Sequence, residues 1–335
     1  MTRHTTFRFR LDPTAEQRET LARHAGAARF AYNQCLRMVR SAMHARRPDA
    51  GAAVPWSKYD LINAFNRWKK SESAGRVWAV GPDGTTEMVS AGLAWRDDVC
   101  QQVFEEAAVD CSRALRSWAD RSSSRNGRRA GPPRFKKKAG TVPSFRMRNS
   151  SREGRRPAIR VGADGRPRSV TLPRVGAIAV RDDTRRLRRM IATGRARILF
   201  ATVSHRGGRW WVSLNVEAAD LHPSQRHSPR GGDDAAGWVG VDRGLIAFAV
   251  AATADGTKIV HVDAPPRPLR SALTRQRRLS RNLSRAQKGS HRRKRAGTKL
   301  RRHHAHVANV RKHFLHQVCN AWSRPTTGSS SKISM

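Results

Sequence analysis

The sequence is poor in cysteine and has no long hydrophobic run, and each absence excludes a class of protein. Its four cysteines, Cys35, Cys100, Cys111 and Cys319, lie far apart with no C-x-x-C pair, so neither a disulfide framework nor a zinc site is predicted. No apolar run approaches the roughly 18 residues of a membrane span, and the opening Met-Thr-Arg-His begins no signal-peptide core. We therefore expect a cytoplasmic protein with no membrane partner.

Acidic residues are scarce relative to basic residues. The 335 residues include 67 Lys and Arg but 25 Asp and Glu, a net charge of +42, and no acidic residue follows Asp263. A compact chain of this charge repels itself unless a polyanion neutralises it, so nucleic acid is the first expected partner. The apolar fraction of 38% is enough for a core, and the length suits about two domains. The composition leaves the oligomeric state undefined.

The N-terminal third predicts a strand followed by helices. Phe7, Phe9 and Leu11 alternate with polar residues as in a short strand. Thr14 and Gln17 have the spacing of a capping box at a helix start. We expect that helix to be interrupted near Gly26, giving a helix-turn-helix. Further along, the pattern predicts a helix at 59–68, a hairpin through 81–84, an amphipathic helix at 97–118 and a loop at 122–127.

The pattern changes to strands after residue 131. The strand-like runs are 145–148, 170–172, 178–180, 198–203 and 210–216, which predict a small antiparallel barrel or sheet with Trp210 in its core. Residues 222–236 are rich in Pro, Ser, Gly and Asp and are typical of a linker. Three more strand-like runs follow at 238–242, 245–251 and 258–262.

The C-terminal part predicts a basic helical hairpin. Leu279 and Leu283 mark its first arm, Gly289-Ser290 the bend, and Val310 and Phe314 its second arm. The last residues are polar and unpatterned, so we expect a disordered tail.

Two groups of basic residues are the candidate nucleic-acid contacts. Cations that alternate with aromatic residues suit phosphate contact with stacking on unpaired bases, and a basic helix can contact successive phosphates. A solvated helix face is the simpler alternative, but the second group has no acidic residues nearby. The first group is Arg134, Lys136, Lys137, Lys138, Arg146 and Arg148, and the second is Arg277, Arg278, Arg281, Arg285, Arg292, Arg293, Lys294, Arg295 and Arg311.

Asp242 is the single most informative acidic residue. It ends a strand-like run and precedes Arg-Gly, a position from which a carboxylate could bind Mg²⁺ in a nuclease. A turn-forming aspartate is the simpler local alternative, and Asp255 is better explained by its Asp-Gly hairpin. The five histidines between 303 and 316 lie among Arg and Lys, which favours phosphate donors or helix surface over a metal site. No nucleotide-binding glycine loop and no nucleophile with a paired base occur.

Several segments in order along residues 5 to 320 make the chain similar to the TnpB (OrfB-type) proteins of insertion sequences, RNA-guided DNA endonucleases related to type V CRISPR effectors. The most specific are Val239-Gly-Val-Asp-Arg-Gly-Leu245, which resembles the first RuvC motif, and the stretch from 278–281 through 310–316. The others are 7–17, 29–33, 133–136, 144–146, 201–204 and 209–214.

The resemblance implies a multidomain α+β protein that binds a guide RNA, a DNA target and Mg²⁺, with Asp242 as the first catalytic aspartate. Its bacterial setting implies a cytoplasmic protein that can associate with the nucleoid. The implied organisation is a wedge-type β-barrel from 1–12 and 131–221, a helical recognition domain with a helix-turn-helix at 13–130, a linker at 222–236, a RuvC-like domain with the basic hairpin at 237–320, and a disordered tail at 321–335.

The sequence departs from this family after Trp322. The family pattern continues there with a strand ending in a catalytic glutamate, a four-cysteine zinc finger and a third aspartate, whereas this sequence reads Ser-Arg-Pro-Thr-Thr-Gly-Ser. We therefore expect a C-terminally truncated member that binds RNA and DNA without cleaving alone, most simply a frameshifted or interrupted gene product. Two alternatives are a non-enzymatic regulator that occupies target sites and a general polycationic packaging protein.

Overall fold

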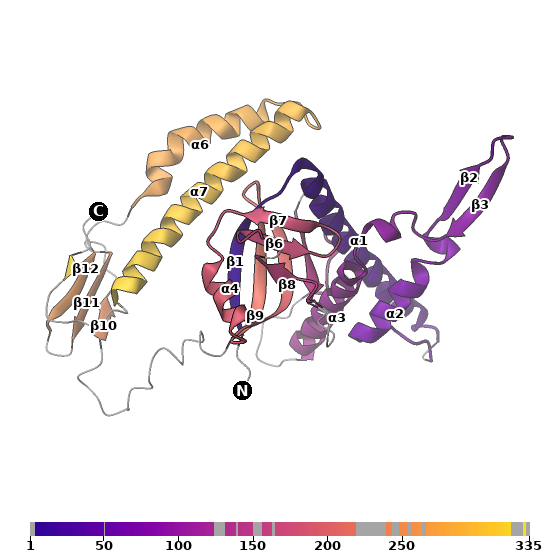
Figure 1. Cartoon of the computed structure of the whole chain (residues 1–335), viewed down its shortest axis with the longest axis horizontal. Coiled ribbons are helices and arrows are strands. Elements are labelled where there is room, and N and C mark those ends of the chain that lie inside the picture. The colour runs from indigo at the N-terminus through magenta and orange to yellow at the C-terminus, as the bar shows by residue number, and fades with distance from the viewer. Residues whose placement is uncertain are drawn as a thin grey trace. The chain divides into compact units, whose positions relative to one another are not determined.

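The computed structural model describes the chain as two compact units, residues 1–222 and 223–335. The residues whose structure is described are 4–49, 51–123, 131–138, 140–149, 156–162, 165–218, 239–242, 248–253, 256–262, 266–322 and 331–332. The predicted linker at 222–236 lies outside them. The mixture of helices and antiparallel strands in the first unit confirms the α+β class (Figure 1).

Three helices form one layer of the first unit. They are α1 (Ala15–Ala45), α2 (Lys58–Trp68) and α3 (Gln101–Ser123). Two short 3-10 turns, Glu72–Ala74 and Arg96–Asp98, flank the hairpin of β2 (Arg76–Val80) and β3 (Thr86–Ala91), which protrudes from the helices (Figure 1). The predicted helices and the hairpin are therefore confirmed. Ser122 and Ser123 belong to α3 rather than to the expected loop, and residues 124–127 lie outside the described part.

The start of α1 is as predicted, but its interruption is not. Thr14 and Gln17 form a complete capping box, in which each side chain accepts a hydrogen bond from the backbone N–H of the other residue. The expected break near Gly26 is wrong, because α1 continues through it without interruption. A glycine inside a helix costs about 1 kcal/mol relative to alanine. The neighbouring Ala25, Ala27 and Ala28 are buried, and their packing offsets that cost.

Seven strands form the second layer of this unit. They are β1 (His4–Asp12), β4 (Ser144–Arg148), β5 (Arg160–Val161), β6 (Ser169–Leu172), β7 (Gly176–Val180), β8 (Arg197–Arg206) and β9 (Arg209–Glu217). Their order is β4-β8-β9-β1-β7-β6-β5. β1 joins β4-β8-β9 to β7-β6-β5, since its residues His4 to Arg10 pair with β9 while Leu11 and Asp12 pair with β7.

Asn149 links the two ends of this sheet through its side chain. The residue follows β4, and its Oδ1 accepts a hydrogen bond from the Ile159 N–H at 2.8 Å, beside β5. Its Nδ2 donates to the carbonyls of Ile159 and Ile198 at 3.2 and 3.0 Å. The amide thus bridges the residue after β4 and the residue before β5, the strands at the two ends of the sheet order.

Alternation of side chains places one face of the sheet in the core. Phe145, Met147, Val212 and Leu214 are all at most 3% exposed, and Trp210 is also buried, as predicted. A short helix that the pattern did not predict, α4 (Arg185–Ala192), packs Leu187 and Met190 onto the same core. Cys35 and Cys111 are free thiols inside it, and burial raises the pKa of Cys111 to about 12, which makes it unreactive.

The second unit combines a small sheet with a helical hairpin. β10 (Val239–Asp242), β11 (Ala249–Thr253) and β12 (Lys258–Val262) form an antiparallel meander. The helices α6 (Pro268–Ser284) and α7 (His291–Trp322) confirm the predicted hairpin. Phe314 and Val318 of α7 pack on Ala251 and Val262 of the sheet.

Part of the expected disordered tail has a defined structure. Ala321 and Trp322 end α7, and β13 (Ser331–Lys332) pairs in parallel with Val260 and His261 of β12. The expectation is wrong for these residues, because the open edge of β12 offers backbone partners to a passing segment. The other residues of the tail lie outside the described part.

His24 links α1 to the residue before α3 as a neutral imidazole, and this predicts a pH dependence. Its Nδ1 lies 2.8 Å from the Thr20 carbonyl, and its Nε2 accepts from the Cys100 N–H at 3.2 Å. Burial lowers the pKa of His24. The unfolded chain therefore takes up a proton below about pH 6.5 before the folded chain does. The contribution of His24 to the free energy of unfolding is fully present above that pH. It decreases as the pH falls, by up to about 1.4 kcal/mol per pH unit.

Urea unfolding followed by tryptophan fluorescence at several pH values between 5 and 7 measures this decrease. His24→Asn should flatten the pH dependence, whereas His44→Asn, at an exposed position of α1, should leave it as in the wild type. An equally steep decrease in the His24 variant would contradict the assignment.

Candidate nucleic-acid interface

Asp242 lies at the end of β10, where the sequence pattern placed it. Val239 to Asp242 pair with Val250 to Thr253, and Asp242 is directly opposite Val250. β10 is at the edge of the sheet order β10-β11-β12-β13, and Asp242 is exposed. Arg243 and Gly244, where the sequence places a turn, lie outside the described residues, as do Asp255 and Asp263.

Asp242 is the single carboxylate among the described residues of the second unit. A carboxylate oxygen is the ligand that Mg²⁺ prefers, and the exposure of Asp242 leaves its oxygens accessible. Within the described ranges, no group of three or more His, Cys, Asp or Glu side chains could hold a metal ion. A two-metal phosphodiester site needs several carboxylates, so Asp242 fits one ligand position and does not make a site by itself.

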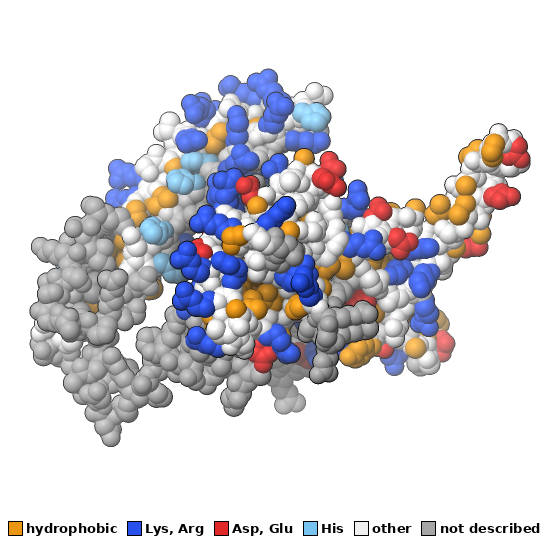
Figure 2. Space-filling view, viewed as in Figure 1, with side chains coloured by type: hydrophobic (Ala, Val, Ile, Leu, Met, Phe, Trp, Pro, Cys, Tyr) orange, Lys and Arg blue, Asp and Glu red, His pale blue; other side chains and the backbone are white. Residues whose placement is uncertain are grey.

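The basic residues of the helical hairpin form a polycationic surface. Lys and Arg side chains cover much of α6 and α7 on the face shown in Figure 2. Because the sequence has no acidic residue beyond Asp263, the hairpin has no acid of its own to neutralise them. The predicted contacts that are exposed here are Arg277, Arg278, Arg281, Arg285, Arg292, Lys294, Arg295 and Arg311. We call these eight residues the hairpin cations.

Arg293 differs from the hairpin cations because its side chain is used inside the fold. Its Nη1 donates to the carbonyls of Leu283 and Ala286, both at 2.9 Å. These acceptors lie at the C-terminal end of α6, where helical carbonyls lack intrahelical partners. Its backbone N–H donates to Ser290 Oγ at 3.1 Å, and Gly289 takes a φ of +88° at the bend. Arg293 therefore stabilises the bend of the hairpin.

Arg293→Ala should lower the free energy of local opening at the bend by about 1 kcal/mol, the net value of the lost hydrogen bonds. Hydrogen exchange of amides in the last turn of α6 should accelerate about fivefold. The neighbouring Arg292→Ala removes the same charge from an exposed side chain and should leave exchange unchanged. Equal exchange in both variants would show that Arg293 has no such role.

The basic segment after residue 131 is attached to α1. Asn33 Oδ1 accepts from the Lys136 N–H at 2.8 Å, and Asn33 Nδ2 donates to the Lys136 carbonyl at 3.1 Å. Arg40 Nη2 donates to the Pro133 carbonyl at 2.7 Å, and its guanidinium lies over the exposed Phe135 ring, 4.7 Å from the centroid. These contacts position the segment and leave Arg134, Lys137 and Lys138 exposed.

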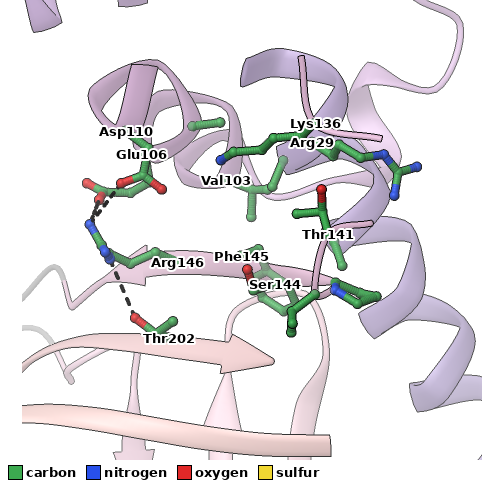
Figure 3. Close-up of a pocket in the computed structure, with 15 residues that line it drawn as sticks. Arg29, Val103, Glu106, Asp110, Lys136, Thr141, Ser144, Phe145, Arg146 and Thr202 are labelled. Atoms are coloured by element: carbon green, nitrogen blue, oxygen red, sulfur yellow. Dashed lines mark hydrogen bonds and ion pairs between the residues drawn. The ribbon is translucent and has the colours of Figure 1, made fainter. Parts of the chain in front are cut away.

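Lys136 is half-buried and points inward. Its Nζ lies 3.7 Å from the centroid of the Tyr32 ring, a cation–π contact that offsets part of the cost of burial. Burial lowers the pKa of Lys136. It lines a small cavity of about 120 Å³ together with Arg29, Glu106 and Asp110 (Figure 3).

Arg146 and Arg148 are paired with acidic side chains of α3. Arg146 Nη1 lies 3.4 Å from Glu106 Oε2 and 3.3 Å from Asp110 Oδ1, and its Nε donates to Thr202 Oγ1 at 3.4 Å (Figure 3). Arg148 pairs with the other oxygen of Glu106. The Arg146 side chain is 23% exposed and that of Arg148 52% exposed, so the outer face of Arg148 remains accessible.

A basic surface on α4 was missed in the sequence. Arg185, Arg186 and Arg189 are exposed there, while Leu187 and Met190 are buried. Asp183 precedes the helix, and its Oδ1 accepts from the Arg185 N–H at 2.9 Å, which lowers the pKa of Asp183. The Arg-Arg-Leu-Arg-Arg run at 185–189 was the signal, since its leucine and the following methionine lie at helical spacing.

The C-terminal histidines are dispersed along α7. His304, His306, His313 and His316 are exposed, and His303 is buried at 7% exposure. Trp211 of β9 has the Arg8 guanidinium over its ring, 4.3 Å from the centroid. None of the described helices combines the length and apolar composition needed to cross a bilayer.

Two family descriptions match the chain. A helix-turn-helix domain (HTH_OrfB_IS605) matches residues 1–47, and a domain described as "Probable transposase" (OrfB_IS605) matches residues 233–324. The chain thus carries two domains of a transposase class, the first of them described as a helix-turn-helix domain. Both are domains of the OrfB_IS605 family, the TnpB type. In this chain, residues 15–45 of the first domain form the single helix α1.

Curated relatives extend the similarity over nearly the whole chain. "Putative RNA-guided DNA endonuclease Rv2885c" of Mycobacterium tuberculosis strain H37Rv is 35% identical over 92% of this chain and 61% of its own length. "Putative RNA-guided DNA endonuclease InsQ" of Escherichia coli K12 is 27% identical over 97% of this chain and 64% of its own length. The chain therefore spans about three fifths of the length of the relatives it matches.

Proposed function

We propose that these 335 residues bind a guide RNA and a DNA target and that Asp242 alone does not support phosphodiester cleavage. The observation that carries the proposal is the hairpin of α6 and α7, whose exposed cations have no acidic residue on the same hairpin. The names of the relatives add RNA and DNA as the two nucleic acids. Bound polyanion would relieve the repulsion among the hairpin cations.

The proposed organisation follows the TnpB type. Residues 1–12 and 131–221 form a wedge-type domain, supported by the pairing of β1 with β9 and by the Asn149 link between the sheet ends. Residues 13–130 form the helical recognition domain. Residues 237–320 form an RNase H-like domain of the RuvC kind, supported by the meander of β10, β11 and β12 followed by helices. The protein acts in the bacterial cytoplasm, at the nucleoid when bound to DNA.

Magnesium would bind at Asp242 in this proposal. When bound, the ion polarises a phosphate oxygen of the nucleic acid. The chain's own contribution is the single carboxylate at the end of β10, an edge strand on which a ligand can approach from solvent. Additional carboxylates would have to complete the ligand set before a second ion could be held.

Binding and cleavage assays with the purified chain test this function. Labelled RNA and DNA should be retained at low ionic strength, and magnesium should produce no cleavage products. Asp242→Ala should bind both nucleic acids as the wild type does. Magnesium-dependent hydrolysis that disappears in Asp242→Ala would refute the second half of the proposal. Failure of the wild type to retain either nucleic acid would refute the first half.

A further inference from the structure

A pocket between the start of α6 and the middle of α7 has the lining of an anion site. Its volume is about 700 Å³, and its polar lining comes from Arg267, Arg270, Ser271, Arg275, His303 and His306. The first four follow each other at helical spacing from the N-cap of α6, and the two histidines are three residues apart on α7. The lining contains no acidic residue, so every polar side chain in it can donate a hydrogen bond.

His303 is the observation that points to a ligand. It is 7% exposed, and its buried Nε2 has no hydrogen-bond partner among the described residues. A buried polar atom without a partner is costly and calls for an explanation. Because the other polar groups of the pocket are cations or donors, an acceptor that carries negative charge would satisfy Nε2–H and neutralise its neighbours at once.

The helix start adds to the same preference. α6 begins at Pro268, and no side chain caps it. The first-turn N–H groups of such a helix lack intrahelical partners, and the helix dipole places partial positive charge there. The first-turn residues that line the pocket are Pro268, Arg270 and Ser271. Pro268 has no N–H and the Ser271 N–H donates to the Arg267 carbonyl at 3.2 Å, so Arg270 is the lining residue that offers a first-turn N–H. The helix terminus, the guanidiniums of three arginines and a buried imidazole thus line one cavity.

We propose that this pocket binds a phosphate group of a nucleic-acid strand. A phosphate offers several acceptor oxygens and negative charge, which matches guanidinium donors and a helix N-terminus. A volume of about 700 Å³ exceeds what one phosphate fills and falls within the range of sites for small organic ligands. The adjoining sugar would lie against the apolar lining of Pro266, Pro268 and Val310. The proposal rests on the nucleic-acid binding proposed above.

The phosphate can come from two sources, an internal phosphodiester or the terminal phosphate of a strand. Both present the same acceptor chemistry to Arg270 and His303. They differ in whether binding depends on the chemistry of the strand end, and the experiment separates them on that basis.

A double-mutant cycle tests whether the pocket residues share one phosphate. Arg270→Gln and Arg275→Gln change exposed side chains, so both should fold. His303→Ala is the third variant, used with circular dichroism to verify its folding. Lys288→Gln is the matched control, because it removes one positive charge from an exposed residue at the bend, outside this pocket. Fluorescence anisotropy measures the dissociation constants for one short RNA with a 5′-phosphate, with a 3′-phosphate or with neither.

Each pocket variant should weaken binding by about tenfold. The effects should not add: Arg275→Gln and His303→Ala should each cost less than about threefold in the Arg270→Gln background, because the shared phosphate is already lost. The effect of Lys288→Gln should add independently to that of each pocket variant.

Coupling that requires a terminal phosphate identifies the strand end as the ligand, and coupling with all three RNAs identifies an internal phosphodiester. If the effects add with every RNA, for the exposed pair Arg270→Gln and Arg275→Gln as well as for His303→Ala, the pocket proposal is wrong. That result would leave nucleic-acid binding intact. A wild type that binds none of the RNAs would refute the proposed function itself.

Discussion

Raising the salt concentration from about 50 to about 200 mM should weaken nucleic-acid binding by about a thousandfold or more. Each phosphate neutralised by Lys or Arg releases counterions, so the logarithm of the affinity falls with the logarithm of salt by about 0.7 to 0.9 per contact. The eight hairpin cations alone could supply the six or more contacts that such a decrease requires. Fluorescence anisotropy over a salt series measures the slope.

Replacing Arg277, Arg278, Arg281 and Arg285 by Gln should reduce that slope by about 3, close to one unit per lost contact. The charge-matched control replaces Arg166, Arg168, Arg206 and Arg209 by Gln, four exposed arginines beside β6 and on β8 and β9. Its slope should stay closer to that of the wild type. Equal slopes for both quadruple variants would mean that net charge, and not the hairpin surface, determines binding.

Local patterns were enough to predict most elements of the fold. The capping box at Thr14, the alternation through Trp210 and the bend at Gly289 each depend on neighbours a few residues away, and the structure confirms all three. The prediction at Gly26 was wrong because the gain that keeps α1 continuous comes from tertiary packing of buried alanines. The link made by Asn149 also depends on residues distant in sequence, Ile159 and Ile198.

The sequence predicts which charged residues belong to the candidate site, but not which of them are held by contacts inside the fold. The hairpin cations are exposed as expected, and Asp242 ends a strand as expected. The pattern could not separate Arg293 from its neighbours, because its carbonyl partners at Leu283 and Ala286 exist only once the hairpin bends. Arg146 is a similar case, since its acidic partners lie 40 and 36 residues away in the sequence.

The partners of Arg146 lead to the second large effect, a loss of stability rather than of binding. Glu106 has only 6% of its side chain exposed. Arg146→Met leaves this carboxylate with Arg148 as its remaining partner and removes the hydrogen bond to Thr202. Removing one member of a buried pair costs about 3 kcal/mol when the other charge is left without compensation. Because Arg148 still pairs with Glu106, the expected loss is smaller, about 2 kcal/mol. The free energy of unfolding of the first unit should fall by that amount in urea titrations.

Two further variants separate structure from nucleic-acid contact. Glu106→Met combined with Arg146→Met removes both charges and should recover much of the lost stability, since replacing a buried pair by apolar side chains is often neutral. Arg148→Met changes a side chain that is 52% exposed and should cost less than Arg146→Met. If Arg146 acts through Glu106, folded Arg146→Met protein binds RNA nearly as the wild type does, whereas Arg134→Gln on the exposed segment binds more weakly. Weak RNA binding by Arg146→Met at full stability would instead assign this guanidinium to the nucleic acid.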